Sequence, residues 1–123
     1  MTGDAAKWPT LQVLVLEDEP LLRLDLQDML GDLGVASVST CSTIEAAIRA
    51  ADAQAFDVAL LDVMVGTQTT VALAQTLQQR GTSVGFVSGT DGDLLPQALK
   101  SCPLLRKPYT PAEFKIFFSQ LAS

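Results

Sequence analysis

Short runs of consecutive apolar residues recur along the chain, and longer segments with apolar residues at helical spacing lie between them. An apolar run without polar alternation is typical of a strand covered on both faces, as in a parallel sheet between helices. The third run is the most regular, because four apolar residues are followed directly by Asp62. The pattern predicts five short strands, at 13–16, 35–38, 58–62, 84–87 and 104–105.

The segments between these runs carry helical spacing and capping signals. Ser42 and Glu45 match the capping box of the second helix. The buried side of that helix is expected to hold Ala47, Ile48 and Ala51. The expected helices begin at Pro20, after Ser42, at Val71 and after Thr110, and Gly34 and Gly81 end the first and the third.

Regular alternation of strands and helices predicts an α/β fold with a parallel sheet. For five strands we expect a flavodoxin-like doubly wound sheet, (βα)5, with the strand order 2-1-3-4-5. Segment 91–99 departs from the alternation, because Pro96 would break a helix there, and we expect a stunted or mobile element. Residues 1–10 are expected to form a loose lead-in, with Trp8 at the edge of the core, and residues 11–123 one domain.

Composition narrows the classes of function. The net charge of −6 disfavours binding to nucleic acid or to anionic lipid. No apolar run approaches the ~20 residues of a membrane span, and the first ten residues do not have the apolar core of a signal peptide, so we expect a cytoplasmic protein. Cys41 and Cys102 lie outside any CxxC pattern and are expected to be free thiols. The chain has no histidine, which excludes catalysis, metal binding or phosphoryl transfer by a histidine of its own.

Acidic residues follow the two strands that flank the switch point of the predicted sheet. Glu17 and Asp18 come directly after the first strand, and Asp62 ends the third. Three carboxylates in one crevice would repel each other, and a divalent cation with oxygen ligands, Mg²⁺, resolves that repulsion. Asp62 is then a candidate nucleophile, because carboxylates form acyl phosphates in phosphoryl transfer.

Strands four and five supply groups that suit the charge of a phosphoryl group. Ser88 offers a hydroxyl, and the amides of Gly89 and Thr90 follow it. Lys107 offers an ammonium just after the fifth strand, and we expect a cis peptide bond between Lys107 and Pro108. Phosphate-binding loops of the GxxxxGKS or GxGxxG type do not occur, which leaves a nucleotide-binding function without support.

Each candidate residue also has a simpler interpretation. Glu19 is assigned to capping of the first helix and Asp57 to the start of a strand. The other candidates, taken one at a time, fit equally ordinary roles: Glu17 and Asp18 as helix caps, Ser88 as a turn residue and Lys107 as a solvated surface lysine.

Four fragments, in this order, resemble the response-regulator receiver domain of two-component systems over nearly the whole chain: 16–20, 60–64, 86–89 and 106–109. The resemblance implies that Asp62 is the phosphoacceptor. It also implies a Mg²⁺ site made of Glu17, Asp18, Asp62 and the backbone carbonyl of Met64. Ser88 then corresponds to the hydroxyl residue that binds the phosphoryl group, and Lys107 to the lysine of the family. Residues 11–123 would form the receiver domain.

Departures from the family pattern concern how a signal leaves the site. Leu104 occupies the position of the aromatic switch residue, three before the lysine, and Glu17-Asp18 replaces the commoner Asp-Asp pair. The stretch 86–90 is similar to the Phe-Ala-Thr-Gly-Tyr signature of atypical stand-alone receivers of bacteria. We expect Leu104, Thr90 and Tyr109 to belong to the switch or partner surface.

The resemblance implies a single-domain response regulator in a phosphorelay. A sensor histidine kinase or phosphotransfer protein would donate the phosphoryl group, and the chain would catalyse its transfer to Asp62 and its later hydrolysis. The phosphorylated form would then bind a downstream protein or act as a phosphate sink. The alternatives are a receiver-fold docking module that is not phosphorylated, and a Mg²⁺-dependent phosphatase. The phosphatase lacks a second acid two residues after Asp62, where Met64 stands.

Overall fold

The structure is a computed structural model of the chain and describes residues 3–89 and 92–122. In the described residues, five strands form one sheet in the order β2-β1-β3-β6-β7, and all four pairs of neighbours are parallel. This is the predicted order 2-1-3-4-5, so the predicted fold is confirmed. The strands are β1 (Gln12–Leu16), β2 (Ser37–Cys41), β3 (Val58–Asp62), β6 (Ser83–Ser88) and β7 (Leu104–Arg106).

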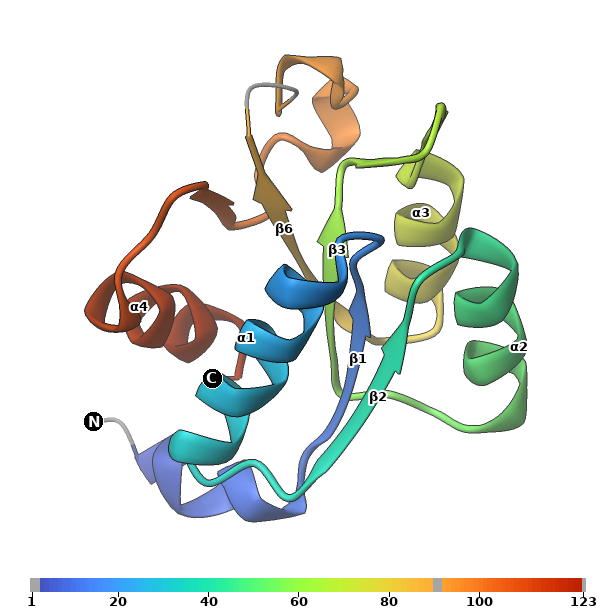
Figure 1. Ribbon diagram of the computed structural model, residues 1–123. Helices are drawn as coiled ribbons and strands as arrows, with labels where there is room; N and C mark the ends of the chain where they lie inside the picture. The colour runs from blue at the N-terminus through green and yellow to red at the C-terminus, as the bar shows by residue number, and fades with distance from the viewer. Residues whose placement is uncertain (1–2, 90–91, 123) are drawn as a thin grey trace.

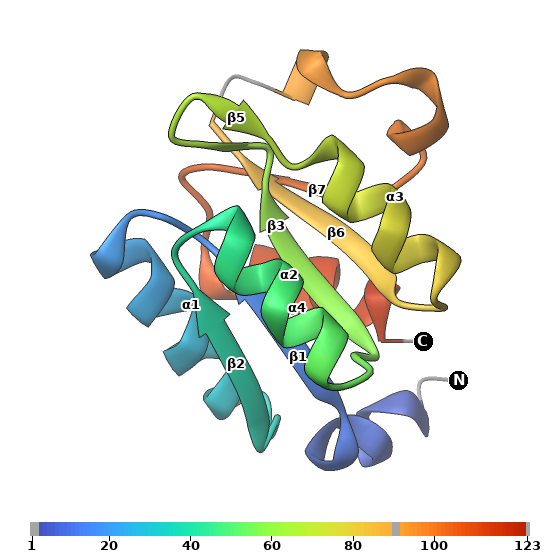
Figure 2. The same ribbon diagram turned by 90° about the vertical axis from the view of Figure 1, so that its right-hand side faces the viewer.

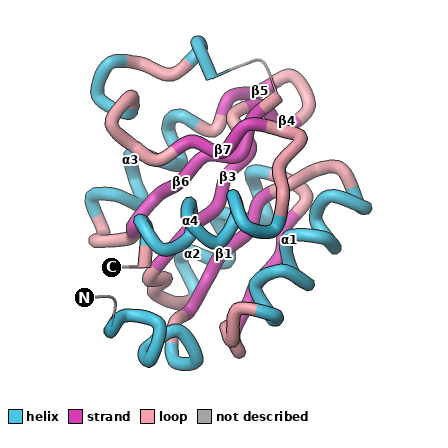
Figure 3. The backbone as a smooth tube through the Cα atoms, turned by 90° about the vertical axis from the view of Figure 1, so that its left-hand side faces the viewer, coloured by secondary structure: helices cyan, strands magenta, loops and turns pink. Residues whose placement is uncertain are grey.

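Helices cover both faces of the sheet (Figure 1). One pair, α1 (Pro20–Asp32) and α4 (Pro111–Leu121), lies on the face seen in Figure 3, and the other pair, α2 (Ile44–Ala53) and α3 (Val71–Gln79), lies on the face seen in Figure 2. Successive residues of a strand point to opposite faces. Val13 and Val15 of β1 therefore pack with α1 and α4, and Leu14 and Leu16 pack with α2 and α3.

Between β6 and β7, the described residues do not form a regular α-helix. Two short 3-10 helices take its place, η2 (Gly92–Leu94) and η3 (Gln97–Leu99), with Pro96 between them. The prediction of a stunted element is confirmed, because proline cannot continue the helical hydrogen bonding.

Residues 64–69 form a small hairpin, β4 (Met64–Val65) with β5 (Gln68–Thr69), which was not predicted. Gly66 opens its two-residue turn with a φ of 62°. A glycine that begins such a turn is the signal that could have predicted the hairpin. The hairpin begins two residues after Asp62, one of the candidate site residues.

The N-terminal segment is not loose. Residues Gly3–Thr10 form a 3-10 helix, η1, at the end of the sheet opposite the carboxyl ends of the strands (Figure 1). Trp8 is buried, and its ring meets that of Phe118 edge-on at 5.2 Å between centroids. Burying a large aromatic ring against α4 orders the segment, which composition alone did not reveal.

The second strand was predicted at 35–38 but lies at Ser37–Cys41. Val35 is a buried residue of the turn before it, and its amide donates to Leu30 at the end of α1. The true strand is an edge strand with one neighbour, β1, and four of its five residues are partly or fully exposed. Its serines and threonine concealed it from a search for apolar runs.

Two expectations for α2 are also wrong. Thr43, and not Ser42, caps the helix, because its hydroxyl accepts a hydrogen bond from the Ala46 amide at 3.1 Å. Ile48 is 44% exposed, whereas Ala47 is fully buried. Small residues such as Ala47 form the buried side of α2, and Ile48 lies at the margin between α2 and α3. The helix start after Thr110 and the glycine ends of α1 and α3 are confirmed, and Thr110 and Glu113 form a capping box.

Cys41 and Cys102 both lie in the described part of the chain and are free thiols, as expected. Among residues 3–89 and 92–122, none of the helices is long and apolar enough to cross a membrane.

Candidate functional site

Three carboxylates meet at the carboxyl ends of β1 and β3. These strands are direct neighbours, with Leu16 opposite Leu61, so the residues that follow them share one edge of the sheet. One oxygen each from Glu17, Asp18 and Asp62 lies within 4.8 Å of the others. Glu17 and Asp62 are buried, at 1% and 8% exposure, and Asp18 is exposed. The structure therefore places together the acids that the sequence singled out.

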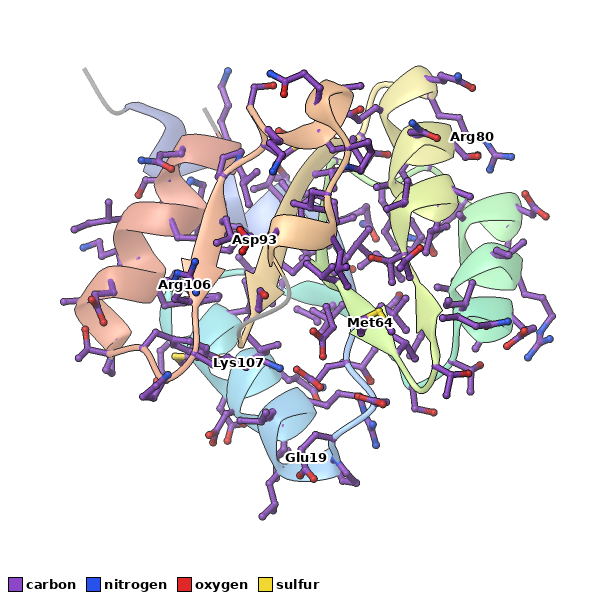
Figure 4. The ribbon with its side chains drawn as sticks, turned by 90° about the horizontal axis from the view of Figure 1, so that it is seen from above. Glu19, Met64, Arg80, Asp93, Arg106 and Lys107 are labelled. Carbon is purple, nitrogen blue, oxygen red and sulfur yellow. The ribbon has the colours of Figure 1, made fainter. Side chains whose placement is uncertain are left out.

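Lys107 enters the same site from the end of β7. Its Nζ donates to Glu17 Oε1 at 2.9 Å and to Asp62 Oδ2 at 3.2 Å. Its backbone amide donates to the Ser88 carbonyl at 2.7 Å, and the Lys107–Pro108 bond is cis, as predicted. Figure 4 looks down on this edge of the sheet, with Lys107 on one side and Met64 on the other. One ammonium thus bridges the two buried carboxylates.

The charges of the site act on each other. Burial, reinforced by the charge of Glu17, raises the pKa of Asp62 to about 6, although Lys107 acts in the opposite direction. Burial alone would lower the pKa of Lys107, but hydrogen bonds and charges from Glu17 and Asp62 outweigh it and raise that pKa. Lys107 therefore stays an ammonium, while Asp62 changes between its two forms in mildly acidic solution, at a higher pH than an ordinary aspartate.

Backbone contacts anchor the first acidic pair. Glu17 Oε2 accepts from the Glu19 amide at 3.1 Å, and Arg23 donates to the Glu17 carbonyl at 3.0 Å. Glu19 caps α1 by accepting from the Leu21 amide at 3.0 Å, so its predicted capping role is confirmed. Sequence reasoning missed Arg23, which lies one helical turn beyond the acids and looks like a solvated residue between apolar positions.

The β4–β5 hairpin contacts the site at its tip and at its base. At the tip, the Gly66 amide donates to Asp18 Oδ2 at 3.1 Å. At the base, the hydroxyl of Thr70 donates to the Asp62 carbonyl at 2.7 Å. Met64, whose carbonyl is a candidate metal ligand, is the first hairpin residue after Val63. Sequence reasoning missed both Gly66 and Thr70.

Ser88 ends β6 at the same edge of the sheet and is buried. In the register, Asp62 pairs with Val87, the residue just before Ser88, so the two strand ends lie side by side. Ser88 in turn pairs with Arg106, which precedes Lys107. The sheet thus brings the predicted hydroxyl and lysine to the side of Asp62; their roles stay predictions. Thr90 lies outside the described residues.

The predicted switch surface is partly apolar and exposed. Leu104 is 36% exposed on the edge strand β7, and Leu94 of η2 is 54% exposed. Tyr109 is half-buried two residues after Lys107, with its ring 6.2 Å from that of Phe114. Burial raises the pKa of the Tyr109 phenol to about 12, so its hydroxyl stays protonated.

The donor set fits a hard divalent cation. Oxygen atoms from three carboxylates, two of them buried, converge within reach of one ion. Mg²⁺ binds in proteins through a few carboxylates and keeps several waters, which matches a site with one exposed acid. A softer metal would need the thiol or imidazole ligands that this cluster does not contain.

The family model of the response regulator receiver domain matches residues 13–114. SdrG from Sphingomonas melonis Fr1 is 29% identical over 92% of this chain and 97% of its own, with a TM-score of 0.81. A response regulator receiver protein from Sinorhizobium medicae WSM419 is 23% identical over 91% of this chain and 94% of its own, with a TM-score of 0.76.

A third similar structure is longer than this chain. A mutant of the anti-anti-sigma factor PhyR from Bartonella quintana is 25% identical over 97% of this chain, with a TM-score of 0.79, and this chain covers 51% of it. A search of curated proteins finds no match. Because the family model spans most of the sequence, the chain belongs to the response regulator receiver domain family.

Proposed function

We propose that this chain is a phosphoacceptor receiver whose nucleophile is Asp62. The observation that carries the proposal is the buried Asp62 carboxylate, held by Lys107 beside Glu17 at the switch point of the sheet. A structural aspartate at a strand end would not need two further acids and a bridging lysine. Residues 11–123 form the receiver domain in this proposal, and residues 1–10 precede it.

Glu17, Asp18, Asp62 and the carbonyl of Met64 would hold Mg²⁺. When bound, the ion neutralises charge on the phosphoryl oxygens during transfer. Asp18 is the acid that solvent reaches most easily, and its contact with the Gly66 amide keeps it directed at the site. Glu17 is fixed from both sides, by Lys107 and by the Glu19 amide.

The partner supplies the phosphoryl group, since this chain has no histidine. A carboxylate oxygen of Asp62 attacks the phosphorus of a phosphohistidine on a sensor kinase or phosphotransfer protein. The N–P bond breaks, and the imidazole nitrogen takes the bonding pair and a proton. Lys107 pairs with one phosphoryl oxygen, and the Ser88 hydroxyl donates to another. Water later cleaves the acyl phosphate and returns Asp62 and inorganic phosphate.

The new phosphate adds about −1.5 to −2 charges beside Lys107 and Ser88. In this proposal its effect reaches the segment between β6 and β7, the exposed residue Leu104 and the half-buried residue Tyr109. Their apolar surface suits a downstream protein partner in a bacterial cytoplasm. The similar PhyR protein of Bartonella quintana is named an anti-anti-sigma factor, which supports signalling by protein docking.

Phosphorylation by a small donor tests the proposal without a known partner. Radiolabelled phosphoramidate and Mg²⁺ should label the wild type through a bond that hydroxylamine cleaves, as expected for an acyl phosphate. Asp62→Asn should abolish the label, whereas Asp57→Asn should retain it, because Asp57 lies at the opposite end of β3. An unlabelled wild type, or equal label on Asp62→Asn, would favour the docking module that is not phosphorylated.

A further inference from the structure

Thr70 is fully buried at the point where the β4–β5 hairpin meets α3. Its hydroxyl donates to the Asp62 carbonyl at 2.7 Å and lies 3.4 Å from the Val63 carbonyl. Its amide donates to Val63 at 2.9 Å, and its own carbonyl accepts from Ala74 at 2.9 Å to start α3. Thr70 therefore joins the end of β3 to the beginning of α3.

The Thr70 hydroxyl does not make the hydrogen bond that is usual at its position in a helix. Thr70 holds the N-cap position of α3, where threonine commonly accepts a hydrogen bond from an amide of the first turn. Within the described part of the chain, its side chain makes no such capping bond. The hydroxyl instead points back to the strand end. Local capping, which would stabilise the helix, has been replaced by a bond to the backbone of Asp62.

The hydrogen bond from Thr70 to Asp62 closes a loop that contributes backbone groups to the candidate site. Residues 63–69 run from Asp62 to Thr70 and include Met64 and Gly66. The tip of the loop is held by the Gly66 amide on Asp18, and its base by Thr70 on Asp62. A buried carbonyl that loses its donor must find another or move, because an unpaired buried polar group is costly. Loss of the hydroxyl would thus disturb Asp62 and Met64 together.

We infer that Thr70 is a positioning residue, whose buried hydroxyl fixes the backbone on which the Asp62 carboxylate and the Met64 carbonyl are mounted. The inference rests on the proposed function, because it assigns Thr70 a part in the Mg²⁺ and phosphoryl site. Thr70 touches neither the ion nor the phosphoryl group; it acts through Asp62 and the hairpin.

The chain contains a matched control at the other end of the same strand. Thr82 is also buried, and its hydroxyl donates to the Phe56 carbonyl at 2.9 Å, just before β3 begins. Thr82→Val and Thr70→Val each remove one buried hydroxyl and keep the branched shape. A general loss of stability should therefore appear in both variants, whereas a disturbed site should appear in one.

The experiment measures Mg²⁺ affinity of the full chain by amide NMR titration, with thermal unfolding in parallel. Thr70→Val should weaken Mg²⁺ binding about tenfold, the lower end of the effect of removing a group that orients a metal ligand. Thr70→Ser keeps the hydroxyl and should bind close to wild type. Thr82→Val should lose stability but keep the wild-type affinity. Faster hydrogen exchange of the Gly66 amide in metal-free Thr70→Val would report the loosened hairpin directly.

The possible outcomes distinguish a failure of the positioning role of Thr70 from a failure of the proposed phosphoacceptor function. Wild-type affinity in Thr70→Val, or equal weakening in Thr82→Val, overturns the role of Thr70 while Asp62 remains the phosphoacceptor. A wild type that neither binds Mg²⁺ nor accepts phosphate overturns both. If Thr70→Val does not fold, Thr70→Ala and Thr82→Ala provide the same comparison with a smaller side chain.

Discussion

The two ends of β3 carry the same residue types in different surroundings. At the amino end, exposed Asp57 accepts from the Gln12 amide at 2.8 Å, and Thr82 donates to the backbone beside it. At the carboxyl end, Asp62 is buried against Glu17 and Lys107, and Thr70 donates to its carbonyl. Each end has an aspartate and a buried threonine that bonds to backbone. The aspartates differ in burial and in charged neighbours.

This difference distinguishes a structural aspartate from a candidate functional one by its surroundings and not by its residue type. The Asp57 carboxylate links β3 to β1 by accepting a hydrogen bond from the Gln12 amide, and any acceptor of similar shape could form this bond. Asp62 has a raised pKa because it is buried beside Glu17, which a merely structural carboxylate would avoid. Perturbed carboxylates in a cluster are typical of functional sites. Substitutions at Lys107, Asp62 and Asp57 test how much each residue contributes to the difference between the two ends of β3.

Removing Lys107 should produce the largest change in stability. Lys107→Met leaves Glu17 and Asp62 as adjacent buried carboxylates with no cation between them. In metal-free buffer at about pH 8, we expect a loss of about 3 kcal/mol in the free energy of unfolding, measured by urea denaturation. Mg²⁺ should restore part of it. Lys115→Met, at an exposed position of α4, is the control. Equal losses in both variants would contradict the contrast between the two ends of β3.

Asp62→Asn should give the next largest effect, with a characteristic pH dependence. The folded-state pKa of Asp62 is raised from 3.8 to about 6, so the folded state holds a proton that the unfolded state has lost between these values. Wild-type stability from this group therefore falls as pH rises through that window, and the full penalty is present above it. Above the window, the full shift corresponds to about 3 kcal/mol. Asparagine also loses the ion pair with Lys107, so Asp62→Asn should be more stable than wild type by roughly 2 kcal/mol without metal.

Thermal unfolding of both proteins in metal-free buffer across this pH range measures the difference. The two curves should converge at the acidic end, where Asp62 is protonated in the folded and unfolded states. A constant difference at every pH would mean that Asp62 does not titrate as its surroundings require.

Much of this site could be predicted from the sequence because its acids follow buried apolar strands. Leu61 and Asp62 show where a fully covered strand ends, and the order of the sheet places Glu17 beside it. Lys107 could be identified by its position after the last short strand. Each of these features can be identified from neighbouring residues in the sequence, and the strand order then places the three side chains close together.

Other contacts left no local signal. Thr70 looks like an ordinary helix cap in the sequence, and only the folded chain reveals that its hydroxyl turns to Asp62. The polar edge strand β2 was missed because most of its residues are partly or fully exposed, and they therefore do not form an apolar run. Ile48 was wrongly predicted to be buried, because helical periodicity does not show that Ala47 lies on the buried side of α2 and Ile48 on its exposed margin.

Asp57→Asn should produce the smallest effect, and it defines the inert end of the strand. Asparagine retains an oxygen that can accept from the Gln12 amide, so only the charge on that hydrogen bond is lost. We expect a loss of about 0.5 kcal/mol in the free energy of unfolding, measured by urea denaturation. Mg²⁺ affinity should not change, because Asp57 is separated from the site by the whole length of β3. An altered affinity would show that the two ends of β3 are coupled, and that Asp62 depends on more than its immediate neighbours.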